Sequence, residues 1–159
     1  MYTKPLVFFS LPPDGPDIPV VDIEIFELNF FAPLRLSRGF AKALHRGKGA
    51  VVNVTSIAGH AIHPFAGSAY SISKTALSGL TREMANEFAE LGVRVNAVAP
   101  GEIETDMLQP EYDMLIPRIP MGHMGSPMDV AKTIFFLCSG DSSFVTGTEV
   151  WVTGGQHML

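Results

Sequence analysis

The sequence predicts an α/β domain, with a mostly parallel sheet of about four strands and helices on both faces. The main observation is an alternation along the chain. Short apolar or β-branched runs are followed by segments whose apolar residues recur every three or four positions. The order β-α-β-α-β-α-β is typical of parallel strands joined by helices. The chain has 159 residues, 47% of them hydrophobic, so we expect one domain over residues 1–159.

Each element follows from its local pattern. Residues 5–9 form a short apolar run before a proline-rich loop, so residues 1–16 are expected to be strand and loop. A helix from about Asp17 to His45 is predicted from apolar residues in steps of three and four, and it ends at the glycines of "RGKG". The remaining predicted elements are a strand at 50–56, a helix at 69–90, a strand at 93–100, an irregular loop at 102–125, a helix at 126–139 and a strand at 148–155.

Composition excludes several classes of function. A net charge of −5 argues against general affinity for nucleic acid or an anionic membrane. The longest N-terminal apolar run, Leu6–Leu11, is too short for a spanning helix or a signal peptide. The single cysteine, Cys138, lies in an apolar run and is expected to be a buried thiol. We therefore expect a cytoplasmic protein that binds neither nucleic acid nor membrane.

Tyr70 and Lys74 stand at the start of the predicted helix 69–90, in the stretch "GSAYSISKTAL". Residues four apart share a helix face, so the phenol and the ammonium are expected to be neighbours. A phenol with a pKa of about 10 is a poor acid at neutral pH, and a nearby ammonium favours its ionised form. Ser56 precedes Tyr70 by fourteen residues and ends a predicted strand. Its hydroxyl could hold a substrate oxygen beside the phenol, an arrangement suited to proton transfer.

A tyrosine and a lysine at this spacing are also common as a packing residue and a solvated one. The placement of Ser56 and the small residues of "YSISK" favour a site. In open parallel sheets, ligands bind beyond the carboxyl ends of the strands. Ser56, Pro100 and Gly101 are all predicted to lie at such ends.

Pro33 falls inside the first predicted helix. Proline lacks an N–H, and its ring displaces the carbonyl four residues back, here that of Asn29. We expect a kink there, with the Asn29 carbonyl left without its helical partner. That carbonyl could hold a water, or the proline could simply bend the helix around the core.

Other polar residues are expected to play smaller parts. His60 and His63 lie in a loop with no third ligand in view, so no metal site is predicted and they are expected to line a substrate loop. Three acidic residues after the strand 93–100 are expected to be solvated. These are Glu102, Glu104 and Asp106.

Five stretches in order resemble the C-terminal half of the short-chain dehydrogenase/reductases. They are "VVNVTSIAG", "SAYSISKTAL", "VRVNAVAPGEIETDM", "GSPMDVAKTIFFLCS" and "TGTEVWVTGG". The resemblance implies a truncated Rossmann-like fold in which residues 17–159 are the catalytic half. It also implies an oxidoreductase that transfers hydride between NAD or NADP and a carbonyl or alcohol substrate.

The resemblance further implies a role for each matching residue. Tyr70 would be the acid/base, Lys74 its modulator and a ligand of the nicotinamide ribose, and Ser56 the partner of the substrate oxygen. The backbone carbonyl of Asn29 would bind a water that relays protons to Lys74. The segment expected to wrap the nicotinamide comprises Pro100, Gly101, Ile103 and Thr105.

The chain also departs from the family's pattern. It has no glycine-rich turn of the kind that cradles a pyrophosphate, and Phe8 and Phe9 stand where the family carries asparagines. Cofactor binding is therefore expected to be weak or absent. The strand 5–9 would become an exposed apolar edge, which favours self-association into a homo-oligomer. Two hypotheses result: an oxidoreductase, or a truncated inactive relative that acts as an oligomerisation or interaction module or is a decayed gene product.

Overall fold

A parallel sheet forms the centre of the molecule. The structure is a computed structural model, and it describes residues 23–105 and 110–159. Strands β1 (Ala50–Val54), β2 (Arg94–Pro100) and β3 (Glu149–Val152) lie in the order β1-β2-β3. Val52 pairs with Asn96, and Ala99 pairs with Trp151. Three strands are therefore described where about four were expected, and the fourth, at 5–9, lies outside the described residues.

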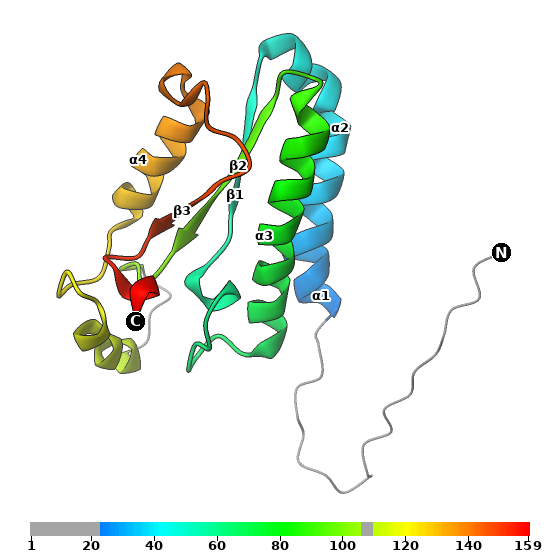
Figure 1. Cartoon of the computed structure of the whole chain (residues 1–159). Coiled ribbons are helices and arrows are strands. Elements are labelled where there is room, and N and C mark those ends of the chain that lie inside the picture. Colours follow the sequence, from blue (N-terminus) through cyan, green and yellow to red (C-terminus); the bar gives the residue numbers. More distant parts are fainter. Residues whose placement is uncertain (1–22, 106–109) are drawn as a thin grey trace, which may run out of the picture.

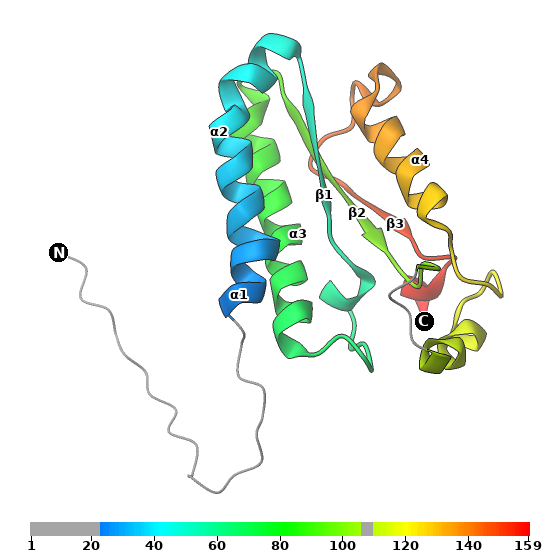
Figure 2. The ribbon, with the colours of Figure 1, turned by 180° about the vertical axis from the view of Figure 1, so that it is seen from behind.

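Helices cover both faces of this sheet, as predicted. Helix α3 (Ser68–Ala89) lies against one face with α2 (Ala32–Gly47) beside it, and α4 (Pro127–Cys138) covers the other (Figures 1 and 2). The short helix α1 (Ile23–Phe26) and a π-helical turn (Glu27–Phe31) lead into α2. Short 3₁₀ segments occur at Ile57–Gly59, Pro110–Arg118, Gly140–Ser142 and Gln156–Met158. No helix in the described parts of the chain is long and apolar enough to cross a membrane.

The core follows the central strand. Val95, Ala97 and Val98 of β2 are fully buried because helices pack on both faces of this strand. Met84 and Phe88 of α3 contribute to a core cluster with Val95 on one side. The middle of the sheet is therefore rigid, and functional groups can be held at its carboxyl edge.

Two helix ends show how local sequence sets the boundaries. Ser126 and Asp129 cap the start of α4 reciprocally, with Pro127 at the first helical position, as the sequence indicates. The end of α2 differs from expectation, because Lys48 rather than a glycine takes the left-handed conformation, with φ of 49°. Gly49 is needed for a different reason: a Cβ there would lie 2.9 Å from Leu44 Cδ2.

Two further expectations change with the structure. The expected start of the first helix at Asp17 lies outside the described residues, and within them the helix is interrupted by the π-helical turn just before Pro33. Cys138 is exposed at the end of α4, so the expectation of a buried thiol was wrong. The apolar run around Cys138 faces solvent in part, with Phe135 and Phe136 among its exposed residues.

Candidate active site

The carboxyl edge of the sheet brings the predicted residues together. Ser56 is the second residue after the end of β1, and Pro100 ends β2. Tyr70 and Lys74 occupy the first turns of α3. The end of β1 is held beside β2 because the Thr55 N–H donates to the Val98 carbonyl at 2.8 Å. This edge is where parallel sheets bind their ligands.

Lys74 is fixed between the helix and the sheet. Its Nζ donates a hydrogen bond of 2.8 Å to the carbonyl of Val54, the last residue of β1. The same Nζ lies 5.5 Å from the centroid of the Tyr70 ring. Burial lowers the pKa of Lys74, because a charged ammonium loses hydration there. The structure thus places a cation beside the phenol, as the spacing predicted.

Ser56 is oriented by the short turn that follows it. Its backbone is extended, and its hydroxyl oxygen accepts a hydrogen bond of 3.1 Å from the Ala58 N–H. Within residues 23–105 and 110–159, the proton of this hydroxyl has no acceptor. A hydroxyl held in this way can donate its proton to a substrate oxygen.

Gly59 locks this turn onto α3. A Cβ at Gly59 would lie 3.0 Å from the backbone carbon of Lys74 and 3.0 Å from the nitrogen of Thr75, so a side chain would push the loop away. The Thr75 hydroxyl donates to the Gly59 carbonyl at 2.6 Å. The distance between Ser56 and Lys74 is therefore set by direct backbone contact.

Asn29 reaches the same helix from the π-helical turn. Its Nδ2 donates to the Ser73 hydroxyl at 3.0 Å, and that hydroxyl donates to the Tyr70 carbonyl at 2.7 Å. The irregularity predicted from Pro33 is present as a π-helical turn, in which the Ala32 N–H bonds to the Glu27 carbonyl. A second link to the site, through the Asn29 side chain, was not predicted.

The segment after β2 divides into two parts. Pro100 and Gly101 lie at the carboxyl edge beside the end of β1, and the Gly101 N–H donates to the Val152 carbonyl at 3.0 Å. Ile103 instead pairs with Gly125 in an isolated bridge, and Thr105 is exposed. In the described structure, no hydrogen bond joins Ile103 or Thr105 to Tyr70 or Lys74.

Sequence reasoning missed a buried acid beside the site. Glu102 was expected to be solvated, but only 5% of its surface is exposed. His63 Nε2 lies 2.8 Å from its Oε1, and the Gln156 Nε2 donates to the same oxygen at 3.3 Å. The available signal was its position directly after Pro100-Gly101, where the strand turns back over the sheet.

A second carboxylate was also missed. Glu149 accepts hydrogen bonds from the hydroxyls of Thr55 and Ser78, and His60 Nε2 lies 2.9 Å from it. These contacts tie β3 to the end of β1, to α3 and to the loop that carries Ser56. Among residues 23–105 and 110–159, no three His, Cys, Asp or Glu side chains are placed to hold a metal ion.

Comparison with known proteins identifies the family. A family model described as enoyl-(acyl carrier protein) reductase matches residues 23–157. A solved structure from Brucella ovis, described as an oxidoreductase of the short-chain dehydrogenase/reductase family in complex with partially ordered NAD, is 50% identical with a TM-score of 0.64. The match covers 80% of this chain and 50% of the Brucella ovis chain. The chain belongs to the short-chain dehydrogenase/reductase family. The resemblance drawn from the five stretches is thereby confirmed.

Other short-chain dehydrogenase/reductase relatives show how much of the family's length is present. Protein FixR of Bradyrhizobium diazoefficiens is 53% identical over 137 residues, which is 86% of this chain and 49% of FixR. A Brucella melitensis 3-oxoacyl-[acyl-carrier protein] reductase with bound NAD superposes with a TM-score of 0.80 at 33% identity, over 86% of this chain and 52% of that one. The chain spans about half the length of the curated relatives it matches.

Proposed function

We propose that this chain carries the hydride-transfer site of an oxidoreductase that interconverts a carbonyl and an alcohol, with NAD or NADP as cofactor. One observation carries the proposal. The Lys74 ammonium, fixed to the end of β1, lies 5.5 Å from the Tyr70 ring, beside a strand end that presents Ser56.

Each residue has a distinct part in the proposed chemistry. The Tyr70 hydroxyl gives a proton to the substrate oxygen during reduction, or takes it during oxidation. Ser56 donates a hydrogen bond to the same oxygen and holds it beside the phenol. Lys74 holds positive charge next to Tyr70. Asn29 keeps the start of α3 in place through Ser73, and its backbone carbonyl would bind a water that relays protons to Lys74.

The residues present fit the nicotinamide end of the cofactor. Lys74 and Tyr70 offer an ammonium and a hydroxyl for the ribose, and Pro100 and Gly101 lie across the carboxyl edge from them. Ile103 and Thr105 extend this segment. When bound, the nicotinamide supplies or accepts the hydride.

A second candidate function rests on exposed apolar surface. Leu28, Leu36 and Phe40 are exposed along the helix that begins at α1, and Phe135 and Phe144 are exposed near α4. Patches of this kind mark interaction sites in soluble proteins. The alternative is therefore an inactive relative that associates with itself and carries out no hydride transfer.

Cofactor titration separates the two candidates. NADH and NADPH fluorescence would be followed as the chain is added, for the wild type, Lys74→Ala and Lys42→Ala, whose lysine is exposed on α2. We expect submillimolar binding that Lys74→Ala abolishes and Lys42→Ala preserves. Tyr70→Phe should keep cofactor binding and lose carbonyl reduction. An absence of binding at millimolar cofactor would contradict the enzymatic proposal for this chain, and sedimentation would then measure its self-association.

A further inference from the structure

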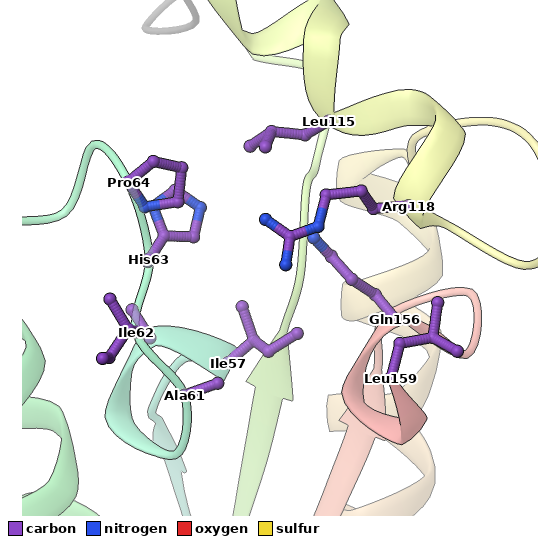
Figure 3. Close-up of a pocket in the computed structure, with 10 residues that line it drawn as sticks. Ile57, Ala61, Ile62, His63, Pro64, Leu115, Arg118, Gln156 and Leu159 are labelled. Carbon is purple, nitrogen blue, oxygen red and sulfur yellow. The ribbon is translucent and has the colours of Figure 1, made fainter.

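An open hollow lies beyond the carboxyl ends of β2 and β3. We call it the Arg118 pocket. It is bounded by the loop 57–64, the 3₁₀ segment Pro110–Arg118 and the segment 156–159, and it encloses about 40 Å³ within a wider hollow of about 420 Å³ that includes open solvent. Figure 3 shows side chains from all three segments directed toward the same space.

The wall of the pocket combines polar and apolar groups, and seven of the ten residues that line it are apolar. Ile57 and Leu115 form its buried part, and Ile62 stands at the rim with 98% of its surface exposed. Leu159 lines the pocket as well and is also exposed. Apolar groups held in water at a rim are stabilised when a ligand covers them. The wall therefore suits the apolar body of a small molecule.

Arg118 adds a charge to this wall. Figure 3 shows its guanidinium reaching into the hollow, toward the side of His63 and Gln156. In the part of the chain that the structure describes, Arg118 makes no ion pair and no hydrogen bond. A guanidinium carries five N–H donors in a planar fork, which matches the oxygens of a carboxylate or phosphate.

Most other polar groups of the pocket have partners, but within the described residues the buried Gln156 Oε1 accepts no hydrogen bond. The Phe65 N–H donates to His63 Nδ1 at 3.2 Å, so this nitrogen carries no proton in that arrangement. His63 Nε2 is then the protonated nitrogen, and it donates to Glu102 at 2.8 Å. Gln156 donates to the same carboxylate. Glu102 thus has two donors, and within residues 23–105 and 110–159 Arg118 does not pair with it.

We propose that the Arg118 pocket binds a small molecule with an apolar body and an oxyanion group, carboxylate or phosphate, that Arg118 holds. The pocket wall includes Ile57, the residue after Ser56, although Ser56 itself does not line the pocket, so a bound molecule would have to extend past Ile57 to reach the serine that would hold the reacting oxygen. This assignment rests on the proposed function: the bound molecule is then the substrate itself, a carbonyl compound or alcohol that carries an anionic group.

Binding can be measured without cofactor or turnover. The probes are hexanoate, hexyl phosphate and hexanamide, which share an apolar chain and differ in charge. Their effects on the NMR spectrum of the ¹⁵N-labelled full chain would be followed for the wild type, Arg118→Gln and Arg82→Gln, whose arginine is exposed on α3. Arg118 is itself exposed, so its replacement should leave the fold intact, and circular dichroism would verify this.

We expect at least one anionic probe to bind about tenfold more tightly than hexanamide, because a charge-assisted hydrogen bond is worth about this factor. The comparison of hexanoate with hexyl phosphate tells which oxyanion the pocket takes. Arg118→Gln should remove the preference, and Arg82→Gln should keep it, with shifts at the amides of Ile57, Ile62 and Leu115. Equal binding of all three probes, or a preference that survives Arg118→Gln, would overturn the site.

Turnover tests whether the bound molecule is the substrate. With a medium-chain oxo acid and its amide as paired substrates, kcat/KM should favour the acid about tenfold, and Arg118→Gln should abolish that preference. Equal kcat/KM values for the acid and the amide would refute the assignment of the bound molecule as the substrate. If the chain binds the anionic probe but not NADH, the ligand site at the Arg118 pocket is supported and the proposed hydride transfer is refuted. The two proposals can therefore fail separately.

Discussion

Ser73 joins the two helical segments that position the candidate site, and its removal should be measurable in stability. The side chain is fully buried, its hydroxyl donates to the Tyr70 carbonyl, and it accepts from Asn29 Nδ2 at 3.0 Å. Ser73→Ala removes both bonds and leaves the Asn29 amide without this acceptor. We expect the free energy of unfolding to fall by about 1–3 kcal/mol, the usual cost of an unsatisfied polar group.

A double-mutant cycle isolates the bond between the two side chains. Asn29→Ala and Ser73→Ala would be measured alone and together, by urea unfolding followed with circular dichroism and with the fluorescence of Trp151, the single tryptophan. The loss of unfolding free energy in the double variant should be about 1 kcal/mol smaller than the sum of the two single losses, because the second substitution removes a bond that the first has already broken. Ser143→Ala, at an exposed position, should change stability by less than about 0.5 kcal/mol.

The result that would refute this reasoning is additivity. If the double variant equals the sum within about 0.3 kcal/mol, the two side chains are independent. Asn29 would then have no energetic connection to α3, and its proposed place in the site would rest on its carbonyl alone.

Two further predictions concern the carboxyl edge. Gly101→Ala should lower the free energy of unfolding in urea by about 1–3 kcal/mol, because its Cβ would lie 2.8 Å from Gln156 Oε1 and 3.1 Å from the Thr153 Cα. Gly79→Ala, in α3 with open space around it, should raise the free energy of unfolding by about 0.5–1 kcal/mol. Equal effects of the two substitutions would contradict the packing argument. Lys74 has a lowered pKa when folded, so the unfolded chain binds more protons between that lowered value and 10.5, and stability rises with pH in this window. The wild type should therefore gain stability relative to Lys74→Met as the pH rises toward 10.5, and a constant difference would count against the burial of the ammonium.

The regular elements were predictable because their signals are local. The strands at 50–54 and 94–100 and the helix 68–89 match the expected ranges within one or two residues, since periodicity and glycine or serine boundaries mark them. Pro33 located the irregular turn because the consequence of a missing N–H is local as well. The approach of Lys74 to Tyr70 followed from helix geometry, because residues four apart share a helix face.

The features that were missed depend on contacts between distant segments. Glu102 reads as solvated among its acidic neighbours, and only the approach of His63, 39 residues earlier, and of Gln156, 54 residues later, explains its burial. The exposure of Cys138 likewise depends on which side of α4 faces the sheet. When a helix is hydrophobic on several sides, an apolar run does not indicate which side faces the sheet. The residues of α4 that face solvent could therefore not be assigned from the sequence.

The π-helical turn Glu27–Phe31 also bears on how this helix can vary. A turn closed by a bond to the fifth residue back contains one residue more than an α-turn, and one residue corresponds to about 100° of rotation about the helix axis. The angular phase of α1 is thus uncoupled from that of α2. A single-residue insertion or deletion here would turn Ile23–Phe26 to a new direction and change how α1 packs against α3. The length of this turn therefore sets whether the Asn29 side chain meets Ser73 at the start of α3.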